Sequence, residues 1–547
     1  MGNGSKLKFV LLVNSPSVAC WEFEVIQHLL ATQKVEPVLC VVKKITTDQR
    51  KPSFFFRLSR FIDRNFFWKV YRKMTGEVPS LKTKENYSLE QLCKLVAVEP
   101  IQHGKNRESF QSNDLAMIRS YHPDFILRFG FDILLGEILG LAKHGVWSYH
   151  HDHPEVIRGG PQGFWEVFLG HETTGLVLQC LNEKLDEGQI LRRGNLRTVL
   201  HSYRGNLEQL MQAGVKWPAQ VVEEIMAGNF GDASQYVGPA KKGRFFSYPD
   251  NNSMIQFFLQ SIYRRAKFHW RDLFFAEKWN VGFLKGVDFF TVTAVNAQWL
   301  KEMPRGVFLA DPFPVASSLN QLFVEYYAYQ QQKGEIHCLD FNGNLLNKTL
   351  VFPHHLSFPF NLSHEGKNYL MPEQASSCKV ECIEALHPAQ PLLLLEGIEA
   401  VDPNLIFFEG KFWLFCTHER KGANAHLCLY FADRLEGPFV EHPQSPVKTD
   451  VAGARPAGEI IMKDNKLYRP GQNCAPGYGA SVIWFEIEEI NEQVYKEKKV
   501  AEIRPDVAGP YPHGLHTMNR IQEGWVIDGK RFEFSFWHSF HKIKQKF

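Results

Sequence analysis

The chain has 547 residues, of which 44% are hydrophobic and 22% charged, and its formal net charge is only +3. This length exceeds what one ordinary hydrophobic core holds, so we expect two or more domains. The composition excludes an intrinsically disordered chain, and the near balance of charge disfavours nucleic acid as a partner.

Apolar segments and cysteine spacing indicate the cellular compartment in which we expect the protein. The longest apolar run near the start covers residues 9–13, far short of a membrane span or the apolar core of a signal peptide. Ten cysteines are scattered without any CxxC pair, which favours reduced thiols over disulfides or a zinc site. We therefore expect a cytoplasmic protein that has no membrane span and acts on small molecules.

The first elements follow a β-α-β pattern. Residues 8–13 and 36–42 read as buried strands, with an amphipathic helix at 21–30 between them. This order predicts the opening of a parallel sheet. An aromatic, basic insertion at 54–73 is predicted to form helices packed on that sheet, and the alternative is a substrate or membrane-surface patch. A helix before Pro123 and a strand from Asp124 follow.

Helical patterns dominate from about residue 203 to residue 285. They cover 206–211, 219–227 and 254–275 and predict a helical cover and connector. The last of these helices is basic, and its cations are Arg264, Arg265, Lys267 and Arg271. We interpret them as a solvated helix face, with a phosphate or RNA surface as the alternative.

From about residue 307 the pattern changes to short strands that repeat. Five strand starts can be marked, at Asp311, Ser357, Asp402, Arg455 and His513. A second strand follows each after 11, 11, 10, 12 and 11 residues, at Leu322, Asn368, Phe412, Leu467 and Gly524. The repeat units are 46, 45, 53 and 58 residues apart, a spacing typical of four-stranded propeller blades. The pattern predicts a five-bladed β-propeller.

A polar motif in the first half carries the chemistry. It reads GVWSYHHDHPEVIRGGPQGFWE at 145–166 and is followed by KLDEG at 184–188. A site that moves protons needs a proton shuttle, and one that builds negative charge on an oxygen needs an oxyanion donor. His150 suits the shuttle because imidazole titrates near neutral pH, and Asp186 would orient and charge it.

Residues 124–194 resemble the core of the formyltransferases that depend on 10-formyltetrahydrofolate, such as methionyl-tRNA, glycinamide-ribonucleotide and sugar formyltransferases. The resemblance rests on three motifs: Ser-Tyr-His at 148–150, Arg-Gly-Gly-Pro at 158–161 and Leu-Asp-Glu-Gly at 185–188. It covers about the first 200 residues and implies a Rossmann-like α/β domain. It also implies 10-formyltetrahydrofolate as the cofactor.

The same resemblance implies roles for individual residues. His150, Asp186 and Ser148 take the catalytic positions. The loop that binds the pterin through its backbone in relatives corresponds to Arg128, Phe129, Gly130, Phe131, Ile133 and Leu134. The substrate-binding positions are Arg158, Gly159 and Trp165.

Ser148 departs from the family pattern, which has asparagine there. The asparagine amide donates to the developing oxyanion, and losing one such donor costs about 3 to 4 kcal/mol. A repositioned serine or the neighbouring His151 would recover part of this, and a fold that binds without catalysing is the alternative. His151, Asp152 and His153 also allow a zinc site, which we disfavour because adjacent ligands in a turn have poor geometry. We predict no metal.

Three carboxylates stand out in the repeated half. Asp311, Asp402 and Glu459 fall on or near first strands of the repeat and would face a central axis, as in glycoside chemistry. Asp-Pro pairs also cap strand starts, and Arg455 would pair with an acid to close the funnel in a purely structural reading.

Residues 307–501 resemble the domain at the start of plant glucosamine inositolphosphorylceramide transferases, which is itself similar to arabinanase-type glycosidase propellers. The resemblance rests on the order of DPFP, HLSFPF, YLMPE, DPNL, ARPAGEI and LYRPGQN. It implies handling of sugars, with carbohydrate binding preferred over hydrolysis.

The sequence therefore predicts a Rossmann-like formyltransferase domain at 1–202, a helical connector at 203–300 and a five-bladed propeller at 301–547. The preferred function is transfer of a formyl group from 10-formyltetrahydrofolate to the amine of an amino sugar or sugar nucleotide, while the propeller binds glycan. The alternative is a catalytically silent first domain with a carbohydrate-binding or glycoside-hydrolysing propeller.

Overall fold

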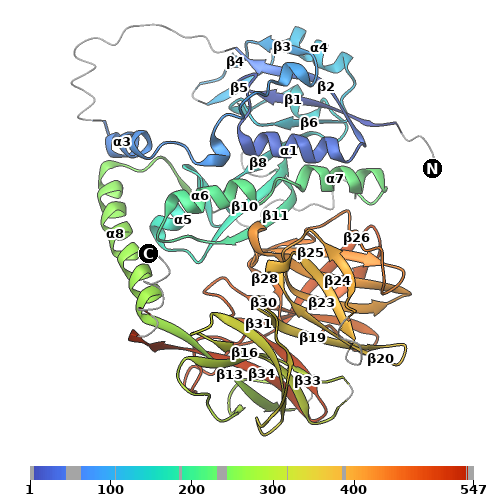
Figure 1. The fold of residues 1–547 in the computed structure, drawn as a ribbon. Helices are drawn as coiled ribbons and strands as arrows, with labels where there is room; N and C mark the ends of the chain where they lie inside the picture. The colour runs from blue at the N-terminus through green and yellow to red at the C-terminus, as the bar shows by residue number, and fades with distance from the viewer. Residues whose placement is uncertain are drawn as a thin grey trace. The chain divides into compact units, whose positions relative to one another are not determined.

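The computed structural model describes residues 5–44, 63–104, 106–183, 188–230, 243–286, 288–316, 318–384, 390–536 and 539. The chain divides into two compact units. The first comprises Met1–Gly194 and Thr198–Arg265, and the second comprises Asn195–Arg197 and Ala266–Phe547. Each unit has its own architecture (Figure 1).

The first unit is built on a seven-stranded sheet of order β11-β10-β8-β6-β1-β2-β3. The strands are β1 (Leu7–Val13), β2 (Val35–Lys43), β3 (Leu95–Val98), β6 (Phe125–Arg128), β8 (Val146–His150), β10 (Thr173–Cys180) and β11 (Gln189–Arg197). Strands β3, β2, β1, β6 and β8 run parallel, and β10 is antiparallel to β8. Two small sheets accompany it, β4 (Ile101–Gln102) with β5 (Arg107–Ser109) and β7 (Ile133–Leu134), and β9 (Ile157–Gly159) with β12 (Arg244–Phe246).

Hydrophobic runs explain this sheet. Residues 9–12 of β1 have no exposed surface, as expected for a central parallel strand that is covered on both faces. The β-α-β opening and the strand after Pro123 are confirmed, and the latter ends at Arg128.

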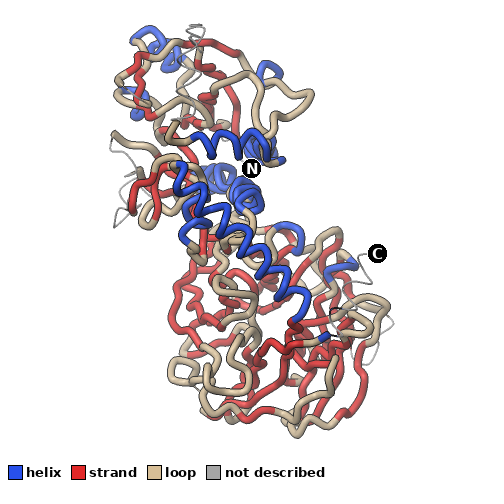
Figure 2. The backbone as a smooth tube through the Cα atoms, turned by 90° about the vertical axis from the view of Figure 1, so that its left-hand side faces the viewer, coloured by secondary structure: helices blue, strands red, loops and turns tan. Residues whose placement is uncertain are grey.

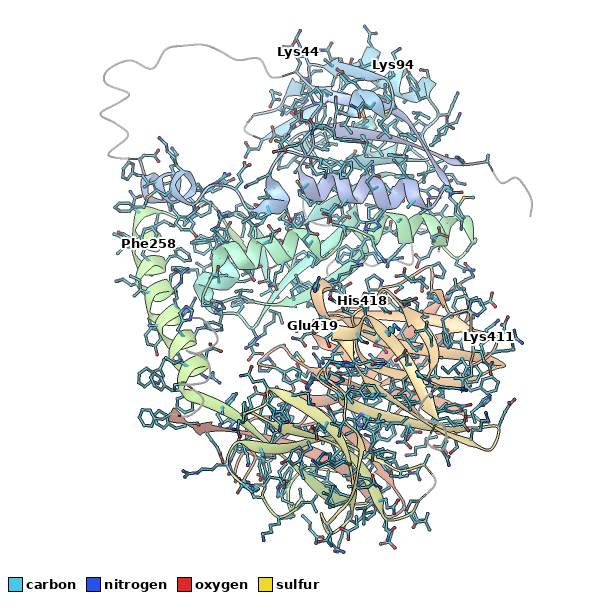
Figure 3. The ribbon with its side chains drawn as sticks, in the orientation of Figure 1. Lys44, Lys94, Phe258, Lys411, His418 and Glu419 are labelled. Atoms are coloured by element: carbon cyan, nitrogen blue, oxygen red, sulfur yellow. The ribbon has the colours of Figure 1, made fainter. Side chains whose placement is uncertain are left out.

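The helices of the first unit lie between the strands of this sheet and after them in the chain. They are α1 (Cys20–Ala31), α3 (Phe66–Thr75), α4 (Ser112–Ser120), α5 (Phe164–Leu169), α6 (Tyr203–Gln212), α7 (Trp217–Met226) and α8 (Asn251–Phe274), with 3₁₀ turns at Pro79–Leu81, Leu89–Gln91 and Glu137–Gly140. Helix α8 is a single 24-residue helix (Figure 2). Phe258 on α8, labelled in Figure 3, meets the Tyr71 ring of α3 at 6.0 Å. Residues 54–62 of the aromatic insertion lie outside the described part, and residues 66–73 belong to α3.

The described residues of the second unit form five successive antiparallel sheets. Their strands are β13 (Phe275–Lys285), β14 (Gln298–Trp299), β33 (Met518–Ile521) and β34 (Gly524–Phe534); β15 (Val307–Pro314), β16 (Gln321–Ala328), β17 (Lys333–Asp340) and β18 (Leu345–Leu350); β19 (Ser357–His364), β20 (Lys367–Glu373), β21 (Lys379–Glu384) and β22 (Leu392–Glu396); β23 (Ala400–Phe408), β24 (Lys411–His418), β25 (His426–Ala432), β26 (Val440–Glu441) and β27 (Lys448–Thr449); and β28 (Ala452–Pro456), β29 (Ile461–Lys463), β30 (Lys466–Asn473), β31 (Ser481–Ile490) and β32 (Tyr495–Ile503). Short 3₁₀ turns lie at Ala375–Ser377 and Glu419–Lys421.

The first and last strands of this unit share a sheet. Strand β13 pairs with β34 along its whole length, from Phe275 opposite Phe534 to Lys285 opposite Gly524. Strands β13 and β14 thus join the all-β unit although they lie within the 203–300 stretch that we expected to be helical.

The repeat that the sequence predicts is present as a repeated backbone irregularity. The pairing of β15, β19 and β23 with the next strand shifts register at a residue with positive φ, namely Asp311, Phe358 and Asp402. Each of the three precedes a proline. A bulge re-aims the side chains of its strand, and bulges are frequent next to binding and catalytic sites.

Candidate functional site

The first candidate site lies at the carboxyl ends of the parallel strands in the first unit. The chain proceeds from β1 to β2 and β3 on one side and from β6 to β8 on the other, so the order reverses between β1 and β6. In open α/β sheets ligands bind in the crevice at such a reversal. Asn14, the residues after Arg128 and those after His150 all follow strand ends at this edge.

Ser148 is buried and bonded to an arginine. It is 2% exposed and stands in register with Arg128 in the parallel β6–β8 pair. Nη1 of Arg128 donates to the Ser148 hydroxyl at 2.8 Å, while Nη2 donates to the carbonyl groups of Phe131 at 2.8 Å and Asp132 at 2.9 Å. A guanidinium group therefore holds the Ser148 hydroxyl in place.

Backbone N–H groups of the loop after β6 form hydrogen bonds to other parts of the protein. The predicted pterin-binding positions in it are Phe129, Gly130, Phe131, Ile133 and Leu134. The N–H groups of Phe129 and Gly130 donate to the Leu12 carbonyl, and that of Phe131 donates to Oδ1 of Asn14. A Cβ at Gly130 would lie 2.4 Å from the Asn14 nitrogen, so only glycine fits. Asn14, which the sequence interpretation missed, anchors this loop.

His150 pairs with a carboxylate that the sequence interpretation did not assign to it. Nδ1 of His150 lies 2.6 Å from Oδ1 of Asp152. The His150 side chain is 19% exposed and that of Asp152 only 4%. The predicted partner, Asp186, lies outside the described residues, together with the rest of 184–187. The His150 ring thus lies at ion-pair distance from a buried carboxylate two positions along the chain.

His151, the next histidine of the motif, packs against aromatic rings. The His151 ring stacks on Tyr149 at 5.7 Å and meets the edge of Trp21 at 5.3 Å. Burial and then the charge of His150 lower the pKa of His151 to about 3, so its ring is neutral. Within the described residues, the three-residue group with metal-ligating atoms close together belongs to the second unit.

The predicted substrate-binding residues hold the β9–β12 ribbon. Nε of Arg158 donates to the Gly243 carbonyl at 2.9 Å, and the Trp165 ring stacks on Phe246 at 4.6 Å. Gly159 has φ of 102°, and a Cβ there would lie 1.9 Å from the Phe246 carbonyl oxygen. The glycine is required because β12 approaches so closely.

A further acid lies near the His150–Asp152 pair. Glu166, on α5, is 2% exposed. Burial and the charge of Asp152 raise its pKa, and the charge of His150 lowers it. The sequence interpretation missed it, although a single acid within the apolar run FWEVFL is a signal that could have found it.

In the second unit, Asp311 belongs to a buried network. It accepts hydrogen bonds from Oγ1 of Thr517 at 2.7 Å and from the backbone N–H of Phe358 at 3.1 Å. The His516 ring lies between two carboxylates, 2.6 Å from Asp528 and 3.3 Å from Asp311. Asp311, His516 and Asp528 have ligand-type atoms within 4.8 Å of one another. The imidazole bridges the two acids and offsets their charge.

Asp402 is bonded to Arg455, as in the structural reading of the sequence. Nε of Arg455 donates to Asp402 at 2.6 Å, Nη2 donates at 3.3 Å and Nε2 of Gln472 donates at 2.8 Å.

Glu459, the third predicted acid, differs from Asp311 and Asp402 because it is exposed. Desolvation by the surrounding protein nevertheless raises the pKa of Glu459, and no effect of Asp402 on it is resolved.

Comparison with known sequences confirms both resemblances as sequence similarity. The family described as glucosamine inositolphosphorylceramide transferase 1, N-terminal, matches residues 294–507. A curated relative of that name from Oryza sativa subsp. japonica is 30% identical over 247 residues, which is 41% of this chain and 33% of the relative. Methionyl-tRNA formyltransferase of Bacillus subtilis is 25% identical over 126 residues, which is 23% of this chain and 40% of that enzyme. The chain thus spans less than half of either relative.

Solved structures are only weakly similar. An N-formyltransferase from Helicobacter canadensis, in complex with folinic acid and dTDP-3-aminofucose, covers 62% of this chain and 97% of its own, at 8% identity and a TM-score of 0.29. An exo-β-1,3-galactanase from Clostridium thermocellum covers 42% and 61%, at 11% identity and a TM-score of 0.31. Within the described residues, no helix is long and apolar enough to cross a bilayer. By sequence, the chain is similar to two groups of transferases, one of which matches residues 294–507 of the second unit.

Proposed function

We propose that the first unit transfers a formyl group from 10-formyltetrahydrofolate to the amine of an amino sugar or sugar nucleotide. The observation that carries this proposal is the His150–Asp152 pair, with 2.6 Å between Nδ1 and Oδ1, at the carboxyl edge of the sheet. Sequence similarity to methionyl-tRNA formyltransferase over 126 residues supports the reaction type. The acceptor is inferred from the sugar-related sequence of the second unit.

Bound 10-formyltetrahydrofolate would supply the electrophilic formyl carbon and a leaving nitrogen. The donor set at the sheet edge fits such a group, because it combines an oriented imidazole with a guanidinium cation. Asp152 binds Nδ1 of His150 and so directs Nε2 to the reactants, where it takes a proton from the amine and returns one to the leaving nitrogen. Asp186 is a second carboxylate proposed for the same histidine.

Arg128 and Ser148 take the place of the family asparagine in this proposal. The guanidinium group polarises the Ser148 hydroxyl through a 2.8 Å hydrogen bond. A charge-assisted hydrogen bond of this kind is about twice as strong as a neutral one. Together the two side chains would stabilise negative charge on the formyl oxygen. The proposed cofactor contacts remain Arg128, Phe129, Gly130, Phe131, Ile133 and Leu134. The proposed substrate-side residues remain Arg158, Gly159 and Trp165.

We further propose that the five sheets of the second unit are the blades of a five-bladed propeller that binds glycan. The repeated bulges at Asp311, Phe358 and Asp402 support a common blade geometry, and the β13–β34 pairing would close the ring. Glycoside hydrolysis by Asp311, Asp402 and Glu459 is the second candidate. The bonds that tie Asp402 to Arg455 favour binding over hydrolysis.

The test of the first proposal is to incubate the purified protein with 10-formyltetrahydrofolate and a panel of amino sugars and sugar nucleotides and to follow release of tetrahydrofolate. We expect turnover with at least one acceptor and loss of it in His150→Ala and Asp186→Asn. The proposal would be overturned if the wild type showed no turnover and did not bind folate. Release of free sugar from a glycan that survives His150→Ala but disappears in Asp311→Asn would assign hydrolysis to the second unit.

A further inference from the structure

Two thiols of the first unit lie next to each other. Sγ of Cys93 is 3.4 Å from Sγ of Cys40. Cys40 belongs to β2 and has no exposed surface, whereas Cys93 is partly exposed. A buried cysteine commonly serves as a small hydrophobic side chain, but two thiols in contact can also react with each other. The proposed function uses neither of them.

The backbone holds these two residues side by side. Cys93 follows the 3₁₀ turn Leu89–Gln91, and its N–H donates to the Leu89 carbonyl at 3.3 Å. The carbonyl of the next residue, Lys94, accepts a 2.8 Å hydrogen bond from the N–H of Cys40. A disulfide bond is about 2.05 Å long, so the sulfur atoms have to approach by about 1.4 Å. Side-chain rotation provides an approach of this size without breaking the backbone hydrogen bonds.

The two thiols differ in acidity and in access to solvent. A hydrogen bond with Cys40 lowers the pKa of the Cys93 thiol, although burial opposes this effect. The same hydrogen bond, together with burial, raises the pKa of Cys40. The thiolate is the reactive form of cysteine, so the partly exposed Cys93 is the thiol that meets an oxidant from solvent. Cys40, which has no exposed surface, reacts second.

We propose that Cys40 and Cys93 form a reversible disulfide when hydrogen peroxide oxidises the protein. The Cys93 thiolate attacks one peroxide oxygen, the O–O bond breaks, and Cys93 becomes a sulfenic acid. The Cys40 sulfur then attacks the Cys93 sulfur, the S–O bond breaks, and the hydroxyl group leaves as water with the Cys40 proton. Two thiols and one peroxide thus give one disulfide and two waters, and the electrons lost by the sulfur atoms reduce the peroxide.

The disulfide fixes a segment that holds the loop between β1 and α1. The N–H of Leu89 donates to the Pro16 carbonyl at 3.0 Å, and the N–H of Lys84 donates to the Val18 carbonyl at 2.8 Å. The 3₁₀ turn joins this segment to Cys93. A covalent bond to β2 at Cys93 therefore restrains the segment in addition to its hydrogen bonds.

The first test maps the cross-link in the full-length protein. Reduced protein is treated with hydrogen peroxide, remaining thiols are alkylated in urea, and tryptic peptides are identified by mass spectrometry without reduction. Trypsin releases Cys40 in peptide 35–43 and Cys93 in peptide 85–94, each with a single cysteine. We expect these peptides to be joined, at a mass lower by two hydrogen atoms than their sum, and to be separated by dithiothreitol. The yield should not depend on protein concentration, because both thiols belong to one molecule.

Two variants control this test. Cys93→Ser should abolish the joined peptides and leave Cys40 reduced, since Cys40 has no exposed surface. Cys20→Ser, the matched control, removes another partly exposed thiol of the same unit and should leave the cross-link unchanged. The inference is wrong if Cys93 is oxidised while Cys40 stays reduced, or if Cys93 joins other cysteines as readily as it joins Cys40.

The second test measures the restraint by hydrogen–deuterium exchange. Backbone amides of residues 84–92 should exchange more slowly in the oxidised wild type than in the reduced wild type, because the cross-link suppresses local opening. Peroxide should not slow their exchange in Cys93→Ser, in which this disulfide does not form. Equal exchange in the oxidised and reduced wild type, or the same slowing in Cys93→Ser, would overturn the restraint. Neither test uses folate or an acceptor, so the outcome is independent of the proposed function.

Discussion

Replacing Ser148 by asparagine, the residue that formyltransferases have there, tests whether the serine is a defect or part of an altered site. The serine is 2% exposed and accepts a 2.8 Å hydrogen bond from Arg128. Asparagine is larger, so it must displace the guanidinium group or strain the β6–β8 pair. We expect Ser148→Asn to lose both stability and turnover.

The magnitude follows from two contributions. Overfilling a packed position costs about 1 to 3 kcal/mol. Loss of a hydrogen bond to a charged group costs about 1.5 to 3 kcal/mol. Together they predict a destabilisation of about 2.5 to 6 kcal/mol. Ser148→Ala, the matched control, removes the acceptor without overfilling and should cost only the second contribution.

The assay is urea denaturation, in which unfolding is monitored by pulsed hydrogen–deuterium exchange. The exchange is measured in peptides that cover β6 and β8, so that unfolding of the second unit does not contribute to the signal. Turnover of 10-formyltetrahydrofolate is measured on the same samples. A Ser148→Asn protein that is as stable as the wild type and transfers formyl groups faster would refute this reasoning. The serine would then be a defect that the chain tolerates.

Three further outcomes are expected. Asp152→Asn keeps the size of the side chain but removes the charge that orients His150, and tetrahydrofolate release should fall by about 100-fold or more; unchanged release would exclude the pair as the proton shuttle. In the second unit, Glu497 holds the 1% exposed Arg469 through two bonds of 2.8 Å, so Glu497→Gln should cost about 3 to 5 kcal/mol in urea denaturation, and an unchanged midpoint would contradict this. Burial alone would raise the pKa of Glu497, but the charges of Arg469 and Lys448 and two hydrogen bonds lower it to about 2, from 4.5. Because the folded pKa is depressed, this stabilisation is complete above pH 4.5, and about 3 kcal/mol of it is lost as the pH falls towards 2; Glu497→Gln should abolish that part of the acid sensitivity.

Local patterns in the sequence were sufficient for the second strands of the repeat, although they did not reveal β13 and β14. The second strands of the five repeats begin within one residue of the predicted positions, as with Gln321 for the predicted Leu322 and Lys411 for Phe412. Strand alternation and turn spacing are properties of a few neighbouring residues, so they are visible without the tertiary structure. The pairing of His150 with Asp152 depended on the bend that follows β8, so strand alternation alone did not reveal it.

The partners of the candidate site depended on strand pairing. Arg128 and Ser148 are twenty residues apart and meet because β6 and β8 pair in one register. Asp402 and Arg455 are likewise brought together from different sheets. Register between distant strands is set by which faces are buried across the whole sheet, and no local pattern encodes it. The sequence by itself thus determined the order of the elements and the histidine at the sheet edge. The tertiary structure decided that Ser148 is bonded to Arg128 and that Glu166 lies buried, since burial and pairing are properties of the folded chain.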